Sequence, residues 1–286
     1  MSNENRPVAV VTGASRGAGA GIARALGGAG YTVYVTGRTV REGDAPLPGT
    51  IGGTAKAIDE AGGKGIAVAV DHRDDEAVAA LFRRVEEEQG RLDILVNNAA
   101  VIDDALIEPG PFWERPLALV DILDVGLRSG YVASFYAAPL MVKTGGGVIA
   151  FTSSFGSVCY MHGPAYGAQK AGVDKFAADM GVDLKEQDVA AISIWMGPLK
   201  TERSMKAIED RPDQYEEIMA NAETPEFTGK LIAAVHKDPE RMTMTGKTLI
   251  GAELGERYSI KDEGRTPPSF REMLGAPRDP HPAIIR

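Results

Sequence analysis

The segment "VVTGASRGAGAGIARAL" (residues 10–26) decides the fold, because it joins an apolar strand, a glycine-rich turn and a helix in that order. Glycines stand at positions 13, 17 and 19, directly after the strand ends at Thr12. Glycine lets the backbone approach a bound group closely, and a helix N-terminus offers unpaired N–H groups. The spacing differs from the commonest dinucleotide fingerprint. The order of elements nevertheless predicts a pyrophosphate site, with a ligand-free turn as the alternative.

Outward from this segment, short apolar runs alternate with helical patterns along the whole chain. The runs are nearly continuous, which is typical of strands covered on both faces of a parallel sheet. The alternation predicts a doubly wound α/β sheet of the Rossmann type, with about seven strands and helices on both faces of a single domain. The expected strands are 8–13, 32–37, 66–71, 93–99, 147–154, 189–195 and 247–252, and the expected helices are 18–29, 52–61, 74–89, 118–142, 164–186 and 225–237.

Composition narrows the class of function. The formal net charge is -9, from 31 basic and 40 acidic residues among 286, which argues against nucleic acid or an anionic membrane as the main partner. One cysteine and four scattered histidines argue against a disulfide and a metal site. No secretory signal and no long apolar run is visible in the sequence. We therefore expect a cytoplasmic protein without a metal.

The end of the second strand, "YVTGRT", bears on cofactor choice. Proteins that bind NAD usually carry an acidic residue here for the adenosine ribose. This chain has Gly37 and Arg38 instead, and Arg16 stands in the glycine loop. Two guanidinium groups suit a 2′-phosphate. The sequence therefore favours NADP(H), with two solvated surface arginines as the alternative.

Two further stretches place reactive groups near the same sheet edge. Ser153 in "FTSSFGS" stands thirteen residues before Tyr166, and Lys170 follows Tyr166 by four in "YGAQK". Residues four apart share a helix face, so an ammonium and an oxidised nicotinamide would lower the phenol pKa from about 10. Asn98 in "LVNNAA" offers a donor and an acceptor, although such a pair often marks only a turn.

These motifs together resemble the short-chain dehydrogenase/reductase family over nearly the whole chain. The resemblance rests on "TGASRGAG", "NNAA", "SS" at 153–154, "YGAQK" and "MGPLKT", and "FWERP", "VGLRSGY" and "AETPEFTGK" are similar to a narrower group within it. It implies hydride transfer between NADP(H) and an alcohol/carbonyl pair. Tyr166 would be the general acid/base, Ser153 would hold the carbonyl oxygen, and Lys170 would lower the Tyr166 pKa. Cofactor contacts are implied for Gly13, Ser15, Arg16, Gly17, Ala18, Gly19, Arg38, Asp71, Asn98, Tyr166, Lys170, Leu199 and Thr201.

One departure from the family stands at Gly126, where the resemblance implies an asparagine of the proton relay. Protons must then take another route, or the chain is a non-catalytic NADP(H)-binding sensor or scaffold; an epimerase or dehydratase is a third possibility. We expect residues 1–258 to form the catalytic domain, with substrate loops at 102–117 and 200–224, and 259–286 to form a tail. The expected substrate is an apolar ketone or aldehyde. Relatives commonly form dimers or tetramers, which implies a homo-oligomer.

Overall fold

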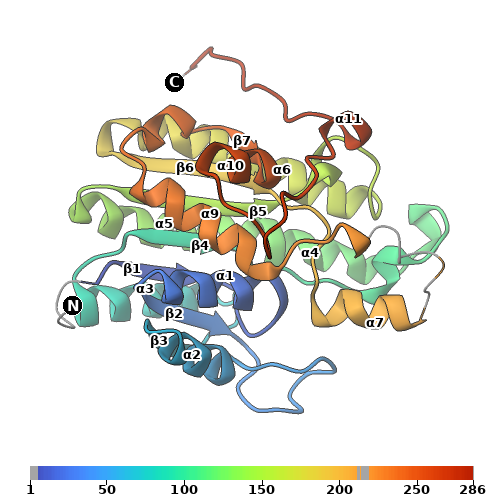
Figure 1. Ribbon diagram of the computed structural model, residues 1–286, viewed down its shortest axis with the longest axis horizontal. Coiled ribbons are helices and arrows are strands. Elements are labelled where there is room, and N and C mark those ends of the chain that lie inside the picture. Colours follow the sequence, from blue (N-terminus) through green and yellow to red (C-terminus); the bar gives the residue numbers. More distant parts are fainter. Residues whose placement is uncertain (1–5, 211–212, 214–218, 286) are drawn as a thin grey trace.

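Parallel strands form one sheet in the order β3-β2-β1-β4-β5-β6-β7 (Figure 1). The computed structural model describes residues 6–210, 213 and 219–285. Within these residues the sheet has seven strands, as the sequence predicts. Their bounds are β1 Val8–Val11, β2 Thr32–Gly37, β3 Lys64–Ala69, β4 Ile94–Asn97, β5 Gly147–Ser153, β6 Val189–Trp195 and β7 Thr248–Ile250.

Helices cover both faces of the sheet (Figure 1). One face carries α1 (Gly17–Gly28), α2 (Ile51–Glu60) and α9 (Pro225–Lys237), and the other carries α3 (Asp75–Gln89), α5 (Ser129–Thr144) and α6 (Pro164–Asp183). Shorter helices are α4 (Asp121–Leu123), α7 (Glu202–Asp210), α10 (Gly251–Tyr258) and α11 (Arg271–Leu274). The predicted doubly wound α/β fold is confirmed.

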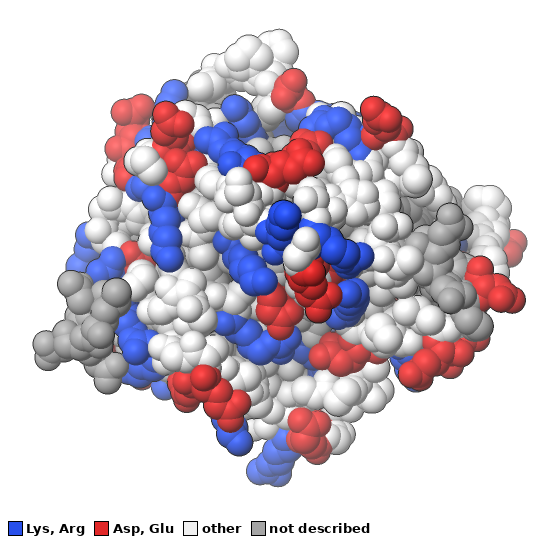
Figure 2. Space-filling view, viewed as in Figure 1, with Lys and Arg blue, Asp and Glu red and all other residues white. Residues whose placement is uncertain are grey.

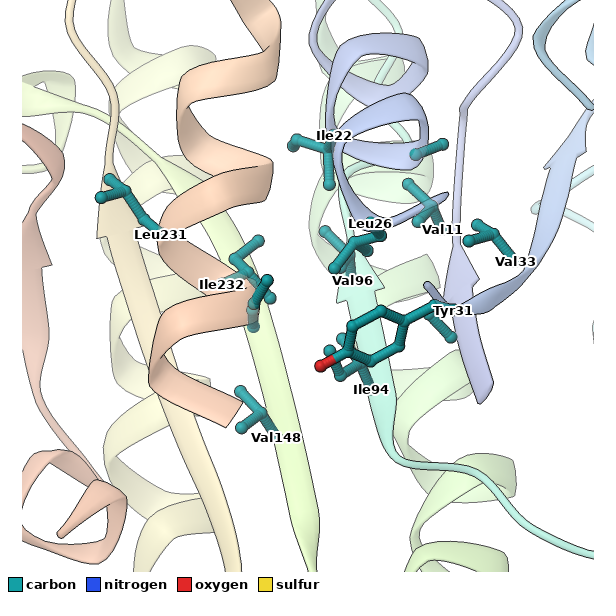
Figure 3. Close-up of a cluster of buried hydrophobic side chains, with 14 of the residues drawn as sticks. Val11, Ile22, Leu26, Tyr31, Val33, Ile94, Val96, Val148, Leu231 and Ile232 are labelled. Carbon is teal, nitrogen blue, oxygen red and sulfur yellow. The ribbon is translucent and has the colours of Figure 1, made fainter. Parts of the chain in front are cut away.

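The larger core cluster fills the space between the sheet and α1, α2 and α9 (Figure 3). Leu26 of α1 and Ile232 of α9 both lie in it, over the strand residues Val96 and Val148. The two helices approach so closely that a Cβ on Gly21 would lie 2.2 Å from Pro225 Cβ. A side chain at that position would push α9 away from α1. Because α1 begins within the glycine loop, this packing also positions that loop.

Two expectations about elements need correction. β3 lies at the sheet edge with exposed or half-buried residues, so it is not covered on both faces as β1, β2, β4, β5 and β6 are. The expected helix 118–142 is interrupted: a 3-10 turn η4 (Leu117–Val120), α4 and a π-helical turn η5 (Asp124–Arg128) precede α5. The described residues include no helix that is both long and apolar enough to cross a membrane.

The first part of the C-terminal tail is tied to the rest of the molecule. The Asp262 carboxylate is buried and accepts a hydrogen bond from Thr224 N at 2.7 Å. Arg271 binds the carboxylate of Glu253 in α10, with Nη2 at 2.6 Å from Oε2. The ring of Phe270 lies 6.3 Å from that of Phe155, which follows β5. The tail therefore contributes to the packing just behind the carboxyl end of β5.

Candidate active site

The parallel strands β1, β4, β5 and β6 all have their carboxyl ends on the same side of the molecule, on the right of Figure 1. Ligands of open α/β sheets bind outside this edge. The glycine loop after β1, the segment 98–120 after β4, the turn after β5 and α7 after β6 all leave from it. Every sequence-predicted site residue lies on these segments, at the end of β2, β3 or β5, in the loop between β6 and α7, or in the first half of α6.

The glycine loop is shaped as an anion cradle. Gly13 and Gly17 have φ of +64° and +56°, which side-chain-bearing residues rarely adopt. Gly17 N, at the first turn of α1, donates a hydrogen bond to Glu202 Oε2 at 2.9 Å. A carboxylate thus occupies the position where a helix N-terminus attracts negative charge, and Ser15, Ala18 and Gly19 belong to the same loop. The residues present fit the pyrophosphate of a dinucleotide.

Asn98 holds this loop in shape. Its Nδ2 donates to Thr12 O at 2.9 Å and to Gly13 O at 3.1 Å. The backbone N–H groups of Asn98 and Ala99 both donate to Thr12 Oγ1 at 2.9 Å. The amide N–H groups of Asn98 are therefore directed at the protein, and its clearest role is to fix the glycine loop to β4.

The two arginines expected at the adenosine end differ in their surroundings. Arg16 donates from Nε to Pro48 O at 2.9 Å and from Nη2 to Gly49 O at 2.8 Å, so it pins the loop that follows β2. The Arg38 side chain is 60% exposed and lies 4.0 Å from a carboxylate oxygen of Asp71. Arg38 is the guanidinium with free donors, and Asp71 is the acidic group beside it.

The hydroxyl beside Tyr166 comes from Ser154. Ser154 Oγ lies 3.0 Å from Tyr166 Oη, whereas Ser153 is fully buried and its hydroxyl donates to Lys170 O at 3.4 Å. The sequence predicted that the Ser153 hydroxyl lies beside Tyr166, and the structure places the hydroxyl of the next residue, Ser154, there instead. Ser153 is the last residue of β5, and Ser154 caps the 3-10 turn η6 (Phe155–Ser157) through a bond from Gly156 N.

Lys170 lies under the Tyr166 ring, with Nζ 5.4 Å from the ring centroid and 3.2 Å from Thr152 O. Burial lowers the pKa of Lys170 to about 8, against a smaller opposing effect of Asp174. Burial also raises the pKa of Tyr166, although the Ser154 hydroxyl opposes this. In the protein alone, desolvation of the phenol dominates, and a lowering of the Tyr166 pKa by Lys170 together with a bound oxidised nicotinamide stays a prediction.

Leu199 and Thr201 lie in the loop between β6 and α7, which a single hydroxyl holds together. Ser204 Oγ donates to Leu199 O at 2.6 Å and accepts from Thr201 N at 2.8 Å. The Thr201 side chain lies beside the cradle, since a Cβ on Gly17 would be 3.7 Å from Thr201 Cγ2. Residues 211–212 and 214–218 of the predicted loop 200–224 lie outside the described residues.

The segment 102–117 after β4 carries two exposed aromatic residues and several contacts to the site. The side chains of Phe112 and Trp113 are exposed and pack edge to face at 5.4 Å. Arg115 donates to His162 O at 3.3 Å, and the His162 ring packs against the edge of Tyr166 at 4.9 Å. Arg203 of α7 pairs with Asp104. These contacts join the two expected substrate loops to each other and to the Tyr166 side of the site.

Charges of both signs alternate over the face shown in Figure 2. Elsewhere among the described residues, Arg24 pairs with Glu226 at 2.5 Å and Arg271 with Glu253 at 2.6 Å.

Comparison with known proteins agrees with this geometry. The model of the family described as short chain dehydrogenase matches residues 7–212. The fold and site define an oxidoreductase class, and the chain belongs to the short-chain dehydrogenase/reductase family.

Within that family the chain is 40% identical over 270 residues to dehydrogenase/reductase SDR family member 1 of Mus musculus, covering 90% of this chain and 84% of that protein. The human protein of the same name is 40% identical over 273 residues, covering 91% and 85%. A solved structure of 3-oxoacyl-[acyl-carrier protein] reductase from Brucella melitensis in complex with NAD is similar, with a TM-score of 0.73 and 25% identity. That similarity covers 86% of this chain and 96% of that structure.

Proposed function

We propose that this protein is an NADP-dependent oxidoreductase that transfers a hydride between NADP(H) and an alcohol/carbonyl pair, acting mainly as a reductase of apolar ketones or aldehydes. The single observation that carries the proposal is the meeting of Tyr166 Oη and Ser154 Oγ at 3.0 Å, with the Lys170 ammonium 5.4 Å from the Tyr166 ring. A hydroxyl pair beside a buried cation, at the edge where the α1 cradle opens, suits a carbonyl oxygen that gains a proton.

The chain's own residues hold the substrate oxygen and supply the proton. Ser154 Oγ and Tyr166 Oη both donate to the carbonyl oxygen, and the Tyr166 proton passes to that oxygen as the alcohol forms. The raised pKa of Tyr166 keeps the phenol protonated at neutral pH, which is the state a proton donor needs. The chemistry that a bound nicotinamide supplies is hydride transfer to the carbonyl carbon.

NADP(H) is the cofactor we propose because Arg38 stands where an acidic residue would bind the ribose hydroxyls of NAD. Its guanidinium is exposed, and the nearest carboxylate oxygen of Asp71 is 4.0 Å away, at the limit of an ion pair. A 2′-phosphate would meet charge-assisted donors there. The cradle from Gly13 to Gly19 and the loop from Leu199 to Thr201 would hold the pyrophosphate and the nicotinamide end.

Exposed aromatic residues suggest an apolar substrate and a homo-oligomer. Phe112 and Trp113 of the 102–117 loop would cover an apolar substrate, the 200–224 loop would also shape its pocket, and residues 1–258 would carry the whole reaction. Tyr131 and Phe135 of α5 expose apolar surface as well, 52% and 62% respectively, which supports a homo-oligomer built through the long helices. We propose a cytoplasmic location for the assembly.

The test is NADPH absorbance over time across a panel of ketones, aldehydes and quinones, with NADH run in parallel. We expect wild type to consume NADPH and Tyr166→Phe to lose about 10³-fold or more in rate while binding NADPH nearly unchanged. Substantial turnover by Tyr166→Phe would contradict the role of the phenol. Binding of NADPH without turnover of any carbonyl by wild type would favour the sensor or scaffold instead.

A further inference from the structure

Gly126 and Gln169 fit each other. Gly126 lies in the π-helical turn η5, and Gln169 lies in α6, directly before Lys170. Gln169 Nε2 donates to Gly126 O at 2.7 Å. A Cβ on Gly126 would lie 3.0 Å from Gln169 Cγ and 3.2 Å from its Cδ, so a side chain at 126 would require Gln169 to shift. The amide of Gln169 occupies the space that a side chain on Gly126 would need.

The other end of the same amide lacks a protein partner. Gln169 is only 2% exposed, and its Oε1 has no hydrogen-bond partner. Buried polar atoms are almost always hydrogen-bonded, and an amide oxygen accepts but does not donate. A water molecule is the donor that a small polar position inside the protein takes most readily.

The neighbouring group on α6 is the ammonium that the reaction depends on. Lys170 is 7% exposed, and one of its three N–H donors is directed at Thr152 O, 3.2 Å away. A proton given up by Tyr166 must be replaced from solvent through a group at this depth. Gly126 has no side chain that could hold a water on this route.

Resting on the proposed function, we propose that Gln169 is a positioning residue of the proton route: its Nε2 anchors the π-helical turn at Gly126, and its Oε1 holds the water through which protons return to Lys170 and Tyr166. The amide that the family carries on the helix before β5 is thus supplied in this chain from α6. No covalent step is added, since the water gives one proton and receives another.

A crystal structure of the wild-type protein tests the water directly, whether or not a substrate is known. We expect an ordered water about 3 Å from Gln169 Oε1 that continues toward Lys170 Nζ. A direct protein donor on Gln169 Oε1, or a dry contact there, would overturn the proposal.

Kinetics of Gln169→Leu give the second readout, with Gln187→Leu, an exposed glutamine, as the matched control. We expect kcat to fall about tenfold, the KM for NADPH to stay within about threefold, and a solvent deuterium isotope effect to emerge because proton return becomes slow. The double variant Gly126→Asn/Gln169→Ala should recover much of the lost kcat. Equal loss in kcat and in thermal stability, with no isotope effect and no recovery, would show a merely structural role. An inactive wild type that still shows the water would count against the proposed function only.

Discussion

The two halves of the site are built differently. At the catalytic half, Lys170 is buried and Tyr166 is half-buried, and both are held by groups of the protein itself, with Ser154 at 3.0 Å from the phenol. At the adenosine half, Arg38 and Asp71 are half exposed and only loosely paired. Interactions between charged or polar groups are strong where the groups are buried, so moving such a group is costly. Interactions between exposed charges are weakened by water and salt. Substitutions should therefore have large effects in the first half and modest effects in the second.

After Tyr166→Phe, the largest expected loss of rate distinguishes the two adjacent serines, Ser153 and Ser154. Ser154→Ala removes the hydroxyl next to Tyr166 and should lower kcat about 10²–10³-fold, because a donor to the developing charge is lost. Ser153→Ala should change kcat by less than about threefold, since Ser153 Oγ is directed at Lys170 O. Steady-state rates of both variants with the same ketone make the comparison. The reverse order of effects would restore Ser153 to the catalytic role.

The buried Lys170 should make stability depend on pH. Its folded pKa of about 8 is below the ordinary 10.5, so between these values the unfolded chain binds more protons and stability rises with pH. Across that window wild type should gain on the order of 3 kcal/mol more than Lys170→Met, which has no group to titrate. Urea unfolding between pH 7.5 and 10.5 measures the gain. The exposed Lys175→Met is the control, and a slope shared by wild type and Lys170→Met would refute the effect.

At the adenosine half, Arg38→Asp should shift cofactor preference toward NADH. Loss of a charge-assisted contact and repulsion of the 2′-phosphate should change the ratio of NADPH to NADH efficiency about 10–100-fold. Kinetics with both cofactors measure the ratio. Arg41→Asp makes the same charge change three residues away, and an equal shift there would mean that only the general field matters.

The smallest effect concerns Glu202, whose carboxylate accepts from Gly17 N at 2.9 Å. A cofactor phosphate would compete with it for the same helix N-terminus, so Glu202→Gln should tighten NADPH binding about fivefold. Fluorescence titration with NADPH gives the affinity. Glu209→Gln, on the same helix α7, controls for net charge. An equal change in NADPH affinity in both variants would show that Glu202 does not compete with the cofactor for Gly17 N.

The sequence predicted the sheet and its helices well because their signals are local: apolar runs, glycines after a strand and helical spacing. It also predicted that Tyr166 and Lys170 share a helix face. It named Ser153 and not Ser154, because the distance along the chain to Tyr166 does not say which hydroxyl the 3-10 turn η6 presents.

Contacts between distant parts of the chain were also beyond the sequence. Gln169 reaches Gly126 across 43 positions, and Glu202 reaches Gly17 across 185. No pattern within one element encodes such pairs, because the packing of α6 against the π-helical turn, and of α7 against α1, brings them together. Desolvation of Tyr166 has the same origin, as its pKa depends on everything that covers the ring.

The two tryptophans of the chain occupy opposite environments at this site. Trp195 is fully buried and packs 5.0 Å from Phe155, while Trp113 is 71% exposed in the short turn Phe112–Glu114. The protein thus carries two intrinsic fluorescent probes with separable emission. Trp195 reports on the packing next to the turn after β5, and Trp113 reports on the 102–117 loop. A collisional quencher in solution would quench the fluorescence of Trp113 and leave that of Trp195. Movement of the 102–117 loop and packing around Phe155 can therefore be followed separately without a label.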